Sequence, residues 1–192
     1  MAKVLLHICC GPCSLYPVEA LRGEGFEVYG FFYNPNIHPY LEYLRRKQAV
    51  EKASRWLGLK MLWKDEYQLK EWLRMVSFRE EERCQLCYHL RLQETARYAR
   101  RGKFDFFTTT LLYSKQQNQE LISQLGESIA REQKVKFLFR DFRAGWKKGI
   151  EQSKKLGLYR QQYCGCIYSE YERFKRIKKL EEKEIGFSTA RS

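Results

Sequence analysis

Thiols are the side chains of this sequence best suited to chemistry, and they occur in close groups. The seven cysteines form three such groups: Cys9-Cys10-x-x-Cys13, Cys84-x-x-Cys87 and Cys164-x-Cys166. A C-x-x-C pair can bind one metal ion or one edge of a cluster, because the turn between the cysteines brings both sulfurs to the same side. The adjacent Cys9 and Cys10 can turn toward the same centre where a strand ends. Four such thiolates suit either a structural zinc ion or a [4Fe–4S] cluster, and spacing alone does not separate these.

The Cys164-Gly165-Cys166 group predicts a different chemistry. Its sulfurs are too close for an unstrained disulfide, and strained disulfides are the ones that are easily reduced. We interpret the pair as redox-active, with two further metal ligands or two incidental loop cysteines as the alternatives. Cys13 is left over, and it can cap a helix with a lowered pKa, complete a second metal site or simply pack.

The beginning of the chain and its charge bear on where it works and on what it binds. Met1 to Ile8 have the pattern of a strand rather than of a secretion signal, which predicts a cytoplasmic protein with reduced thiols. No apolar run approaches the roughly 18 residues of a bilayer span, so we expect no membrane partner. The 36 Lys and Arg residues outnumber the 23 Asp and Glu residues and give a formal net charge of +13. A thermophile-like charged surface explains the abundance of charge but not this imbalance, and we favour RNA as the partner.

Alternating strand and helix patterns predict the elements that position these side chains. Strand patterns cover residues 4–8, 26–33, 60–63, 104–110 and 136–139, and helix patterns cover 15–22, 40–57, 66–75, 88–101 and 116–133. This alternation predicts a three-layer α/β fold, with helices on both faces of a parallel sheet of about five strands. We assign residues 1–143 to this domain. Residues 144–192 form a helical C-terminal extension that carries the Cys-Gly-Cys pair, packs with the domain as one unit and ends in a charged helix at 175–184.

Polar and thiol groups follow the carboxyl ends of the predicted strands. The first cysteine group follows strand 4–8, residues 34–39 follow strand 26–33, residues 108–110 end strand 104–110, and residues 141–143 follow strand 136–139. Ligands of open parallel sheets bind at this edge. We therefore expect these segments to meet at one site.

Six motifs in order give the chain a family resemblance over nearly its whole length. They are LLHICCGPCS at 5–14, NPNI at 34–37, RCQLCY at 83–88, FTTTLL at 107–112, DFR at 141–143 and LYRQQYCGC at 158–166. Together they resemble the cobalamin-independent epoxyqueuosine reductases. Two local departures leave the thiols intact: Ser114-Lys115-Gln116-Gln117 stands where Ser-Pro-Tyr-Gln is expected, and Gly145-Trp146 where Gly-Tyr is usual.

The resemblance implies the last step of queuosine biosynthesis. This step is the two-electron reduction of the epoxide of epoxyqueuosine, at the wobble position of a tRNA anticodon, to an alkene and water. The implied fold is that of the ATP pyrophosphatases and related adenine nucleotide alpha hydrolases, the HUP fold. Cys9 to Ser14 replace their glycine-rich phosphate loop, so we do not expect ATP as a cofactor. The resemblance to a cobalamin-independent family also implies no cobalamin.

The family roles, carried over by position, assign the metal and redox groups. A [4Fe–4S] cluster would be held by Cys9, Cys10, Cys84 and Cys87. Cys164 and Cys166 would form a catalytic redox pair supplied by an external electron donor. Deoxygenating an epoxide needs two electrons and stabilisation of the departing oxygen. We therefore add the hypothesis that Cys13, with Asp141, binds a second mononuclear ion, iron or zinc.

Six further side chains are candidates for contacting the tRNA, although each can instead be a routine loop residue. The candidates are Arg143 and Arg160 for phosphate or a flipped base, Tyr159 and Tyr163 for stacking, and Asn34 and Asn36 for hydrogen bonding. Two other functions stay open. One is a non-catalytic, zinc-stabilised RNA-binding module. The other is an iron–sulfur enzyme that transfers sulfur to tRNA and needs ATP or a persulfide donor.

Overall fold

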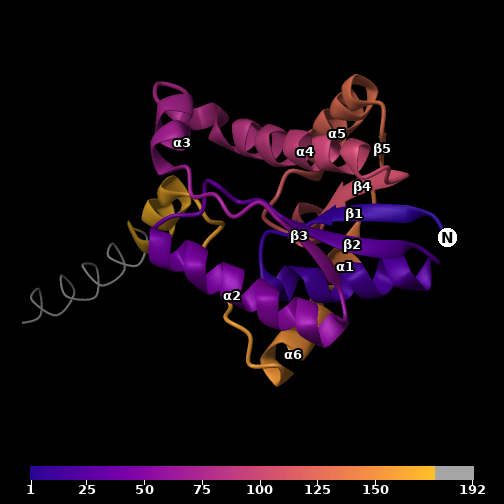
Figure 1. The fold of residues 1–192 in the computed structure, drawn as a ribbon. Helices are drawn as coiled ribbons and strands as arrows, with labels where there is room; N and C mark the ends of the chain where they lie inside the picture. Colours follow the sequence, from indigo (N-terminus) through magenta and orange to yellow (C-terminus); the bar gives the residue numbers. More distant parts are fainter. Residues whose placement is uncertain (176–192) are drawn as a thin grey trace, which may run out of the picture.

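The computed structural model describes residues 1–175 and has the expected parallel sheet at its centre. The strands are β1 (Lys3–His7), β2 (Glu27–Phe32), β3 (Lys60–Trp63), β4 (Phe106–Thr109) and β5 (Lys136–Phe137), in the spatial order β3-β2-β1-β4-β5 (Figure 1). Every neighbouring pair is parallel. The central β1 is fully buried from Val4 to His7, as its unbroken apolar run requires of a strand with both faces covered.

Helices cover both faces of the sheet, which confirms the three-layer α/β fold. One face carries α1 (Gly11–Gly23) and α2 (Tyr40–Leu57), with α6 (Trp146–Lys155) packed against α1. The other carries α4 (Arg83–Arg101) and α5 (Gln119–Gln133), with α3 (Leu69–Val76) against α4 (Figure 1). The chain leaves β1 toward β2 on one side and returns to β4 on the other side. The carboxyl end of β1 is thus the point where the strand order reverses and where ligands of such sheets bind.

Two helices begin earlier than the sequence pattern predicts. The α1 helix begins at Gly11 rather than at residue 15, because Pro12 fits the first helical turn, where no backbone N–H is needed. A Cβ on Gly11 would lie 2.3 Å from the carbonyl oxygen of Ala49, so only glycine permits α1 and α2 to approach so closely. The α4 helix begins at Arg83 rather than at residue 88, directly after a 3-10 turn at Glu80–Glu82. Cys13, Cys84 and Cys87, which the pattern places before the helices, therefore lie in their N-terminal turns.

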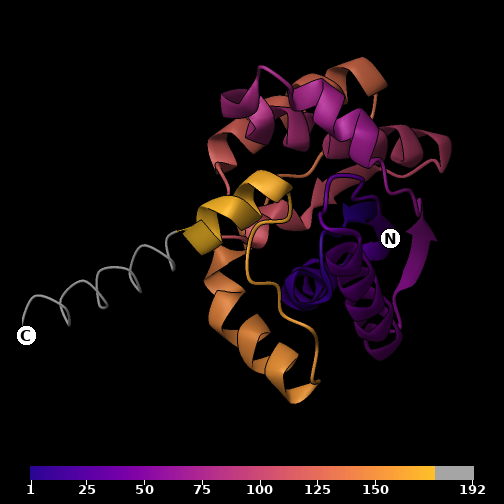
Figure 2. The same cartoon turned by 90° about the vertical axis from the view of Figure 1, so that its left-hand side faces the viewer.

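The part of the C-terminal extension that the structure describes packs against the α/β domain. Leu158 lies in a small apolar cluster with Leu15 of α1 and Ala53 of α2. The chain then crosses to a helical segment at 167–175 (Figure 2). We call residues 158–169 the strap. The boundary at residue 143 stays a prediction, and the charged helix expected at 175–184 lies almost entirely outside the described residues. No helix within residues 1–175 has the length and apolarity to cross a membrane.

Candidate metal and redox site

The first cysteine group lies where β1 ends and α1 begins. Cys10 immediately precedes α1, and Cys13 lies in its first turn. The Cys10 and Cys13 sulfurs are 2.7 Å apart, the Cys9 and Cys10 sulfurs are 3.8 Å apart, and all three lie within 4.8 Å of one another. All three residues are buried. Within residues 1–175, no other group of three or more His, Cys, Asp or Glu side chains is this close, so these thiols are candidates for binding a metal.

Hydrogen bonds and burial set the acidities of these thiols. Hydrogen bonds from the Cys10 and Cys13 thiols, aided by Thr110, lower the pKa of Cys9 well below its usual range. Burial raises the pKa of Cys10, and the hydrogen bonds among the thiols raise that of Cys13. The Thr110 hydroxyl also accepts from the Cys9 backbone N–H at 3.1 Å, which ties the loop after β1 to the end of β4. The N-terminus of α1 adds positive potential that favours a thiolate.

The second group lies in the first turns of α4. Cys84 is exposed and Cys87 is partly buried. Burial raises the pKa of Cys87 to about 11, and the Cys87 sulfur accepts a hydrogen bond from Asn36 Nδ2 at 3.1 Å. Arg83, next to Cys84, forms an ion pair with Glu172 of the helical segment at 167–175.

Only two of the four predicted cluster ligands lie together in the compact group of thiols. Cys9 and Cys10 lie in the compact buried group, whereas Cys84 and Cys87 do not. Each thiolate of a [4Fe–4S] cluster binds a different iron, so its ligands stand farther apart than those of a single ion. The assignment of these four cysteines to a cluster therefore stays a prediction.

The third group lies in the strap. The Cys164 sulfur is exposed and accepts from Gln117 Nε2 at 3.3 Å, and Cys166 Sγ lies 3.6 Å from Ser169 Oγ. All seven cysteines are free in this structure, and the redox role expected of Cys164 and Cys166 stays a prediction. Gly165 between them has a φ of 153°, and a Cβ there would lie 3.3 Å from Arg46 Nη1 and from Ile37 Cγ1. Only glycine fits this position without strain.

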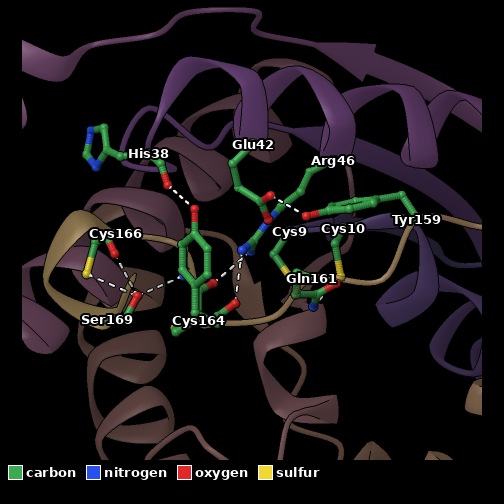
Figure 3. A network of polar contacts seen from close by, with 12 residues as sticks. Cys9, Cys10, His38, Glu42, Arg46, Tyr159, Gln161, Cys164, Cys166 and Ser169 are labelled. Carbon is green, nitrogen blue, oxygen red and sulfur yellow. Dashed lines mark hydrogen bonds and ion pairs between the residues drawn. The ribbon is translucent and has the colours of Figure 1, made fainter. Parts of the chain in front are cut away.

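A buried arginine of α2 anchors the strap (Figure 3). Arg46, which is 1% exposed, donates to the carbonyl oxygens of Cys164 at 2.7 Å and Tyr163 at 2.9 Å. Its Nε also donates to Glu42 at 2.7 Å, and the Tyr159 hydroxyl donates to the same carboxylate. The strap is therefore held by a charged group that is satisfied on all sides.

Further contacts bring the strap over the first cysteine group. Gln161 Nε2 lies 3.1 Å from Cys10 Sγ and 3.6 Å from Cys13 Sγ. The His38 backbone N–H donates to the Gly165 carbonyl at 2.8 Å, and the Tyr163 hydroxyl donates to the His38 carbonyl. The strap thus touches the buried thiols through Gln161 while it carries the third cysteine group.

The residues predicted to contact tRNA divide by their exposure. Arg160 is exposed, and the hydroxyls of Tyr159 and Tyr163 are bonded within the protein. Asn34 is fully buried; its Nδ2 donates to the Ile8 carbonyl at 2.9 Å, and its Oδ1 has no partner. Asn36 is 1% exposed, and its amide is engaged by protein groups. Direct substrate contact by these residues stays a prediction.

Asp141 and Arg143 form a pair at the surface. Arg143 Nη2 donates to Asp141 Oδ2 at 2.6 Å, and Gln119 Nε2 lies 3.4 Å from Oδ1. The hydrogen bonds from Arg143 lower the pKa of Asp141 to about 2. Asp141 does not belong to the compact thiol group. Its role as a metal ligand stays a prediction.

Sequence reasoning missed three side chains of this site. Gln161 carries no signal of its own among the polar residues of the strap. Arg46 and Arg91, in contrast, occupy the buried stripes of α2 and α4, at helical spacing from buried aromatic residues. Arginine is rarely fully buried unless it is paired. An arginine on the apolar stripe of a predicted helix was therefore the sequence signal that could have identified Arg46 and Arg91 as buried residues.

A solved structure shares the fold of this chain. The protein is described as a predicted subunit of tRNA methyltransferase from Methanocaldococcus jannaschii. The match has a TM-score of 0.56 at 12% identity and covers 81% of this chain and 76% of that one. At this low identity, the likeness shows the α/β fold alone.

Curated relatives share the sequence over nearly its full length. The relative named epoxyqueuosine reductase QueH from Dehalococcoides mccartyi is 38% identical over 172 residues, which cover 90% of this chain and 94% of the relative. The one from Thermotoga maritima is 36% identical over 193 residues, covering 95% and 98%. The family model described as epoxyqueuosine reductase QueH matches residues 4–172. The chain therefore belongs to the epoxyqueuosine reductase QueH family.

Proposed function

We propose that this protein reduces the epoxide of epoxyqueuosine in a tRNA anticodon to the alkene of queuosine and releases water. Family membership supports the reaction. The observation that carries it is that three thiol groups, distant in the sequence, are linked at the carboxyl edge of the sheet. Gln161 joins the strap to Cys10, and Asn36, in the loop after β2, contacts Cys87. The same loop binds the strap through the bond between His38 and Gly165. This edge is where open parallel sheets bind their ligands.

We infer that four of the thiols hold a [4Fe–4S] cluster: Cys9, Cys10, Cys84 and Cys87. The donor chemistry fits, because thiolates are the preferred ligands of such clusters and two helix N-termini favour negative charge here. The buried cation Arg91 adds positive charge near these sulfurs, and Arg46 adds less because Glu42 offsets its charge. When bound, a cluster supplies electrons one at a time. The assignment of the cluster rests on the thiolate ligands themselves.

The strap dithiol can supply both electrons that reduction of the epoxide needs. Oxidation of Cys164 and Cys166 to a disulfide releases two electrons and two protons. The epoxide takes up both electrons and both protons as its two C–O bonds break, the carbons form a double bond and the oxygen leaves as water. An external donor then reduces the disulfide, which the short Cys-Gly-Cys spacing keeps strained and reducible. Because Cys164 is exposed, both the tRNA substrate and the external electron donor can approach it.

A second ion is proposed for Cys13. Its sulfur lies within the compact thiol group, although it is not needed for the four-thiolate set. An ion there can polarise the epoxide oxygen. A Cys13→Ser variant should keep its cluster iron and lose activity; normal activity together with normal metal content would remove this role.

The tRNA is proposed as the partner because of the net charge of +13 and the exposed Arg160 of the strap. Phosphate contacts by cations supply most of the salt-dependent affinity for nucleic acids. Arg143 can join them if it leaves Asp141.

The first experiment is anaerobic purification with quantification of iron, acid-labile sulfide and zinc, followed by incubation with tRNA that carries epoxyqueuosine. We expect iron and sulfide in about equal amounts near four per chain, and a nucleoside product lighter by one oxygen atom. Zinc without sulfide and an unchanged nucleoside would favour the zinc-stabilised binding module. A product that has gained sulfur would favour sulfur transfer.

A further inference from the structure

Arg91 is a buried cation without a carboxylate partner among the described residues. It is 3% exposed and lies on α4, one turn after Cys87. The nearest acid along the helix, Glu94, is engaged by Lys64 Nζ at 3.0 Å and by Arg97 Nη1 at 3.0 Å. An unpaired buried charge is costly, so proteins keep one only where another group of opposite sign offsets it. The position of Arg91 therefore calls for an anion that is not a carboxylate.

The contacts of Arg91 lead to a sulfur. Its Nε and Nη2 donate to Asn36 Oδ1 at 3.1 and 2.8 Å, and Asn36 Nδ2 donates to Cys87 Sγ at 3.1 Å. A guanidinium can only donate hydrogen bonds, so the oxygen of the Asn36 amide must face Arg91. Its N–H₂ group must then face Cys87. The orientation of this amide is thus fixed by Arg91 and not by Cys87.

Arg91 meets the thiol site through Asn36, which follows β2 and contacts Cys87 near the start of α4. Cys87 is among the thiols assigned above to the cluster. Hydrogen bonds to the sulfurs, net charge and burial are the factors by which a protein sets the reduction potential of an iron–sulfur cluster. Arg91 contributes to the first two of these factors.

We propose that Arg91 is a positioning residue that acts through Asn36: it aims an N–H donor at the Cys87 thiolate and supplies the positive charge that makes the metal centre easier to reduce. This inference rests on the proposed function only in requiring a cluster held by Cys87. One electron added to the centre increases its negative charge, and both the cation and the N–H···S hydrogen bond stabilise that added charge. Loss of either must shift the reduction potential in the negative direction.

The test is an anaerobic redox titration of the iron-loaded protein, with dithionite as reductant and electron paramagnetic resonance to count the reduced centres. Arg91→Met removes the charge and frees the amide. Asn36→Asp keeps a partner for Arg91 but replaces the N–H donor by an oxygen. The matched control is Arg97→Met, which removes the same charge from the same helix at a position whose side chain is 46% exposed.

At the wild-type midpoint potential, we expect the ratio of reduced to oxidised centres to fall at least tenfold in Arg91→Met, a shift of about 59 mV for one electron. Asn36→Asp should shift in the same direction, and Arg97→Met should match the wild type. If Arg91→Met does not retain iron, the reduction potential of Asn36→Asp serves as the test. A wild-type potential in whichever of the two retains iron overturns the inference. A wild-type protein without iron and sulfide would instead refute the metal centre of the proposed function.

Discussion

Replacement of Arg46 by methionine should release the strap from the α/β domain. Methionine retains much of the buried volume but removes two hydrogen bonds to the strap, those to the carbonyl oxygens of Tyr163 and Cys164. It also removes the pair with Glu42, which is 4% exposed. A hydrogen bond to a charged group contributes about 1.5–3 kcal/mol, whereas the pair with Glu42 lies within α2 and is not broken when the strap opens. From the two lost bonds to the strap, we therefore expect the free energy of strap opening to fall by about 3–6 kcal/mol.

Limited trypsin digestion under native conditions measures this opening, because cleavage after Arg160 requires the strap to leave its site. When opening is fast, the cleavage rate follows the open population. Each 1.4 kcal/mol is a factor of ten, so cleavage should accelerate at least about a hundredfold. Arg46→Lys keeps the charge but not the planar guanidinium that binds two carbonyl groups. Its cleavage rate should therefore lie between those of the wild type and Arg46→Met. Arg55→Met, on the exposed side of α2, is the control.

An acceleration of less than threefold in Arg46→Met, with an unchanged midpoint of urea unfolding, would refute this account of the strap. The strap would then be held by its apolar contacts and by the backbone bond between His38 and Gly165. That outcome would also mean that Arg46 does not position Cys164 and Cys166.

Two further outcomes are expected. Gly165→Ala forces a Cβ into a φ of 153° against Arg46 and should weaken strap closure by about 1–3 kcal/mol in the same trypsin assay, whereas Gly23→Ala, where a Cβ meets nothing within 4 Å, should not. Burial, with the charge of Arg91, lowers the pKa of His38 to about 4 from 6.5. The unfolded chain therefore binds the proton first, and stability falls as the pH is lowered from about 6.5 toward 4. Urea unfolding at pH 7 and pH 5 should show a loss about 1–2 kcal/mol greater in the wild type than in His38→Gln; equal losses would contradict the shift.

The fold was predictable because the local patterns agree with the sheet. The predicted helix at 40–57 and strand at 60–63 coincide with α2 and β3, since Gly58 in a left-handed conformation ends the helix sharply. The helix starts at Gly11 and Arg83 were not predictable in the same way. Cysteine has no strong helix preference. The start of α1 also depends on a contact between Gly11 and Ala49 that only the tertiary structure creates.

The thiols of the site were predictable from their spacing, but the polar groups that hold them were not. Arg46 and Arg91 lie on the apolar stripes of their helices, which indicates burial, but the carbonyls and the amide that they bind come from other segments. Asn36 was expected to bind substrate because it follows β2, and its engagement by Arg91 depends on the packing of α4 over that loop. Chemistry-bearing residue types are visible in a sequence, whereas the groups that satisfy them come from elements far away in the chain.

The two buried arginines differ in one respect that separates their effects. The charge of Arg46 is offset by Glu42, whereas no carboxylate of the described residues pairs with Arg91. Arg46 should therefore act mainly as a tether and Arg91 mainly through its charge. We expect Arg46→Met to accelerate strap cleavage with little change in the reduction potential, and Arg91→Met to shift the potential with little change in cleavage. Both assays on both variants test this division. If each variant altered both properties equally, strap closure and the electrostatics of the thiol site would be one coupled property and not two.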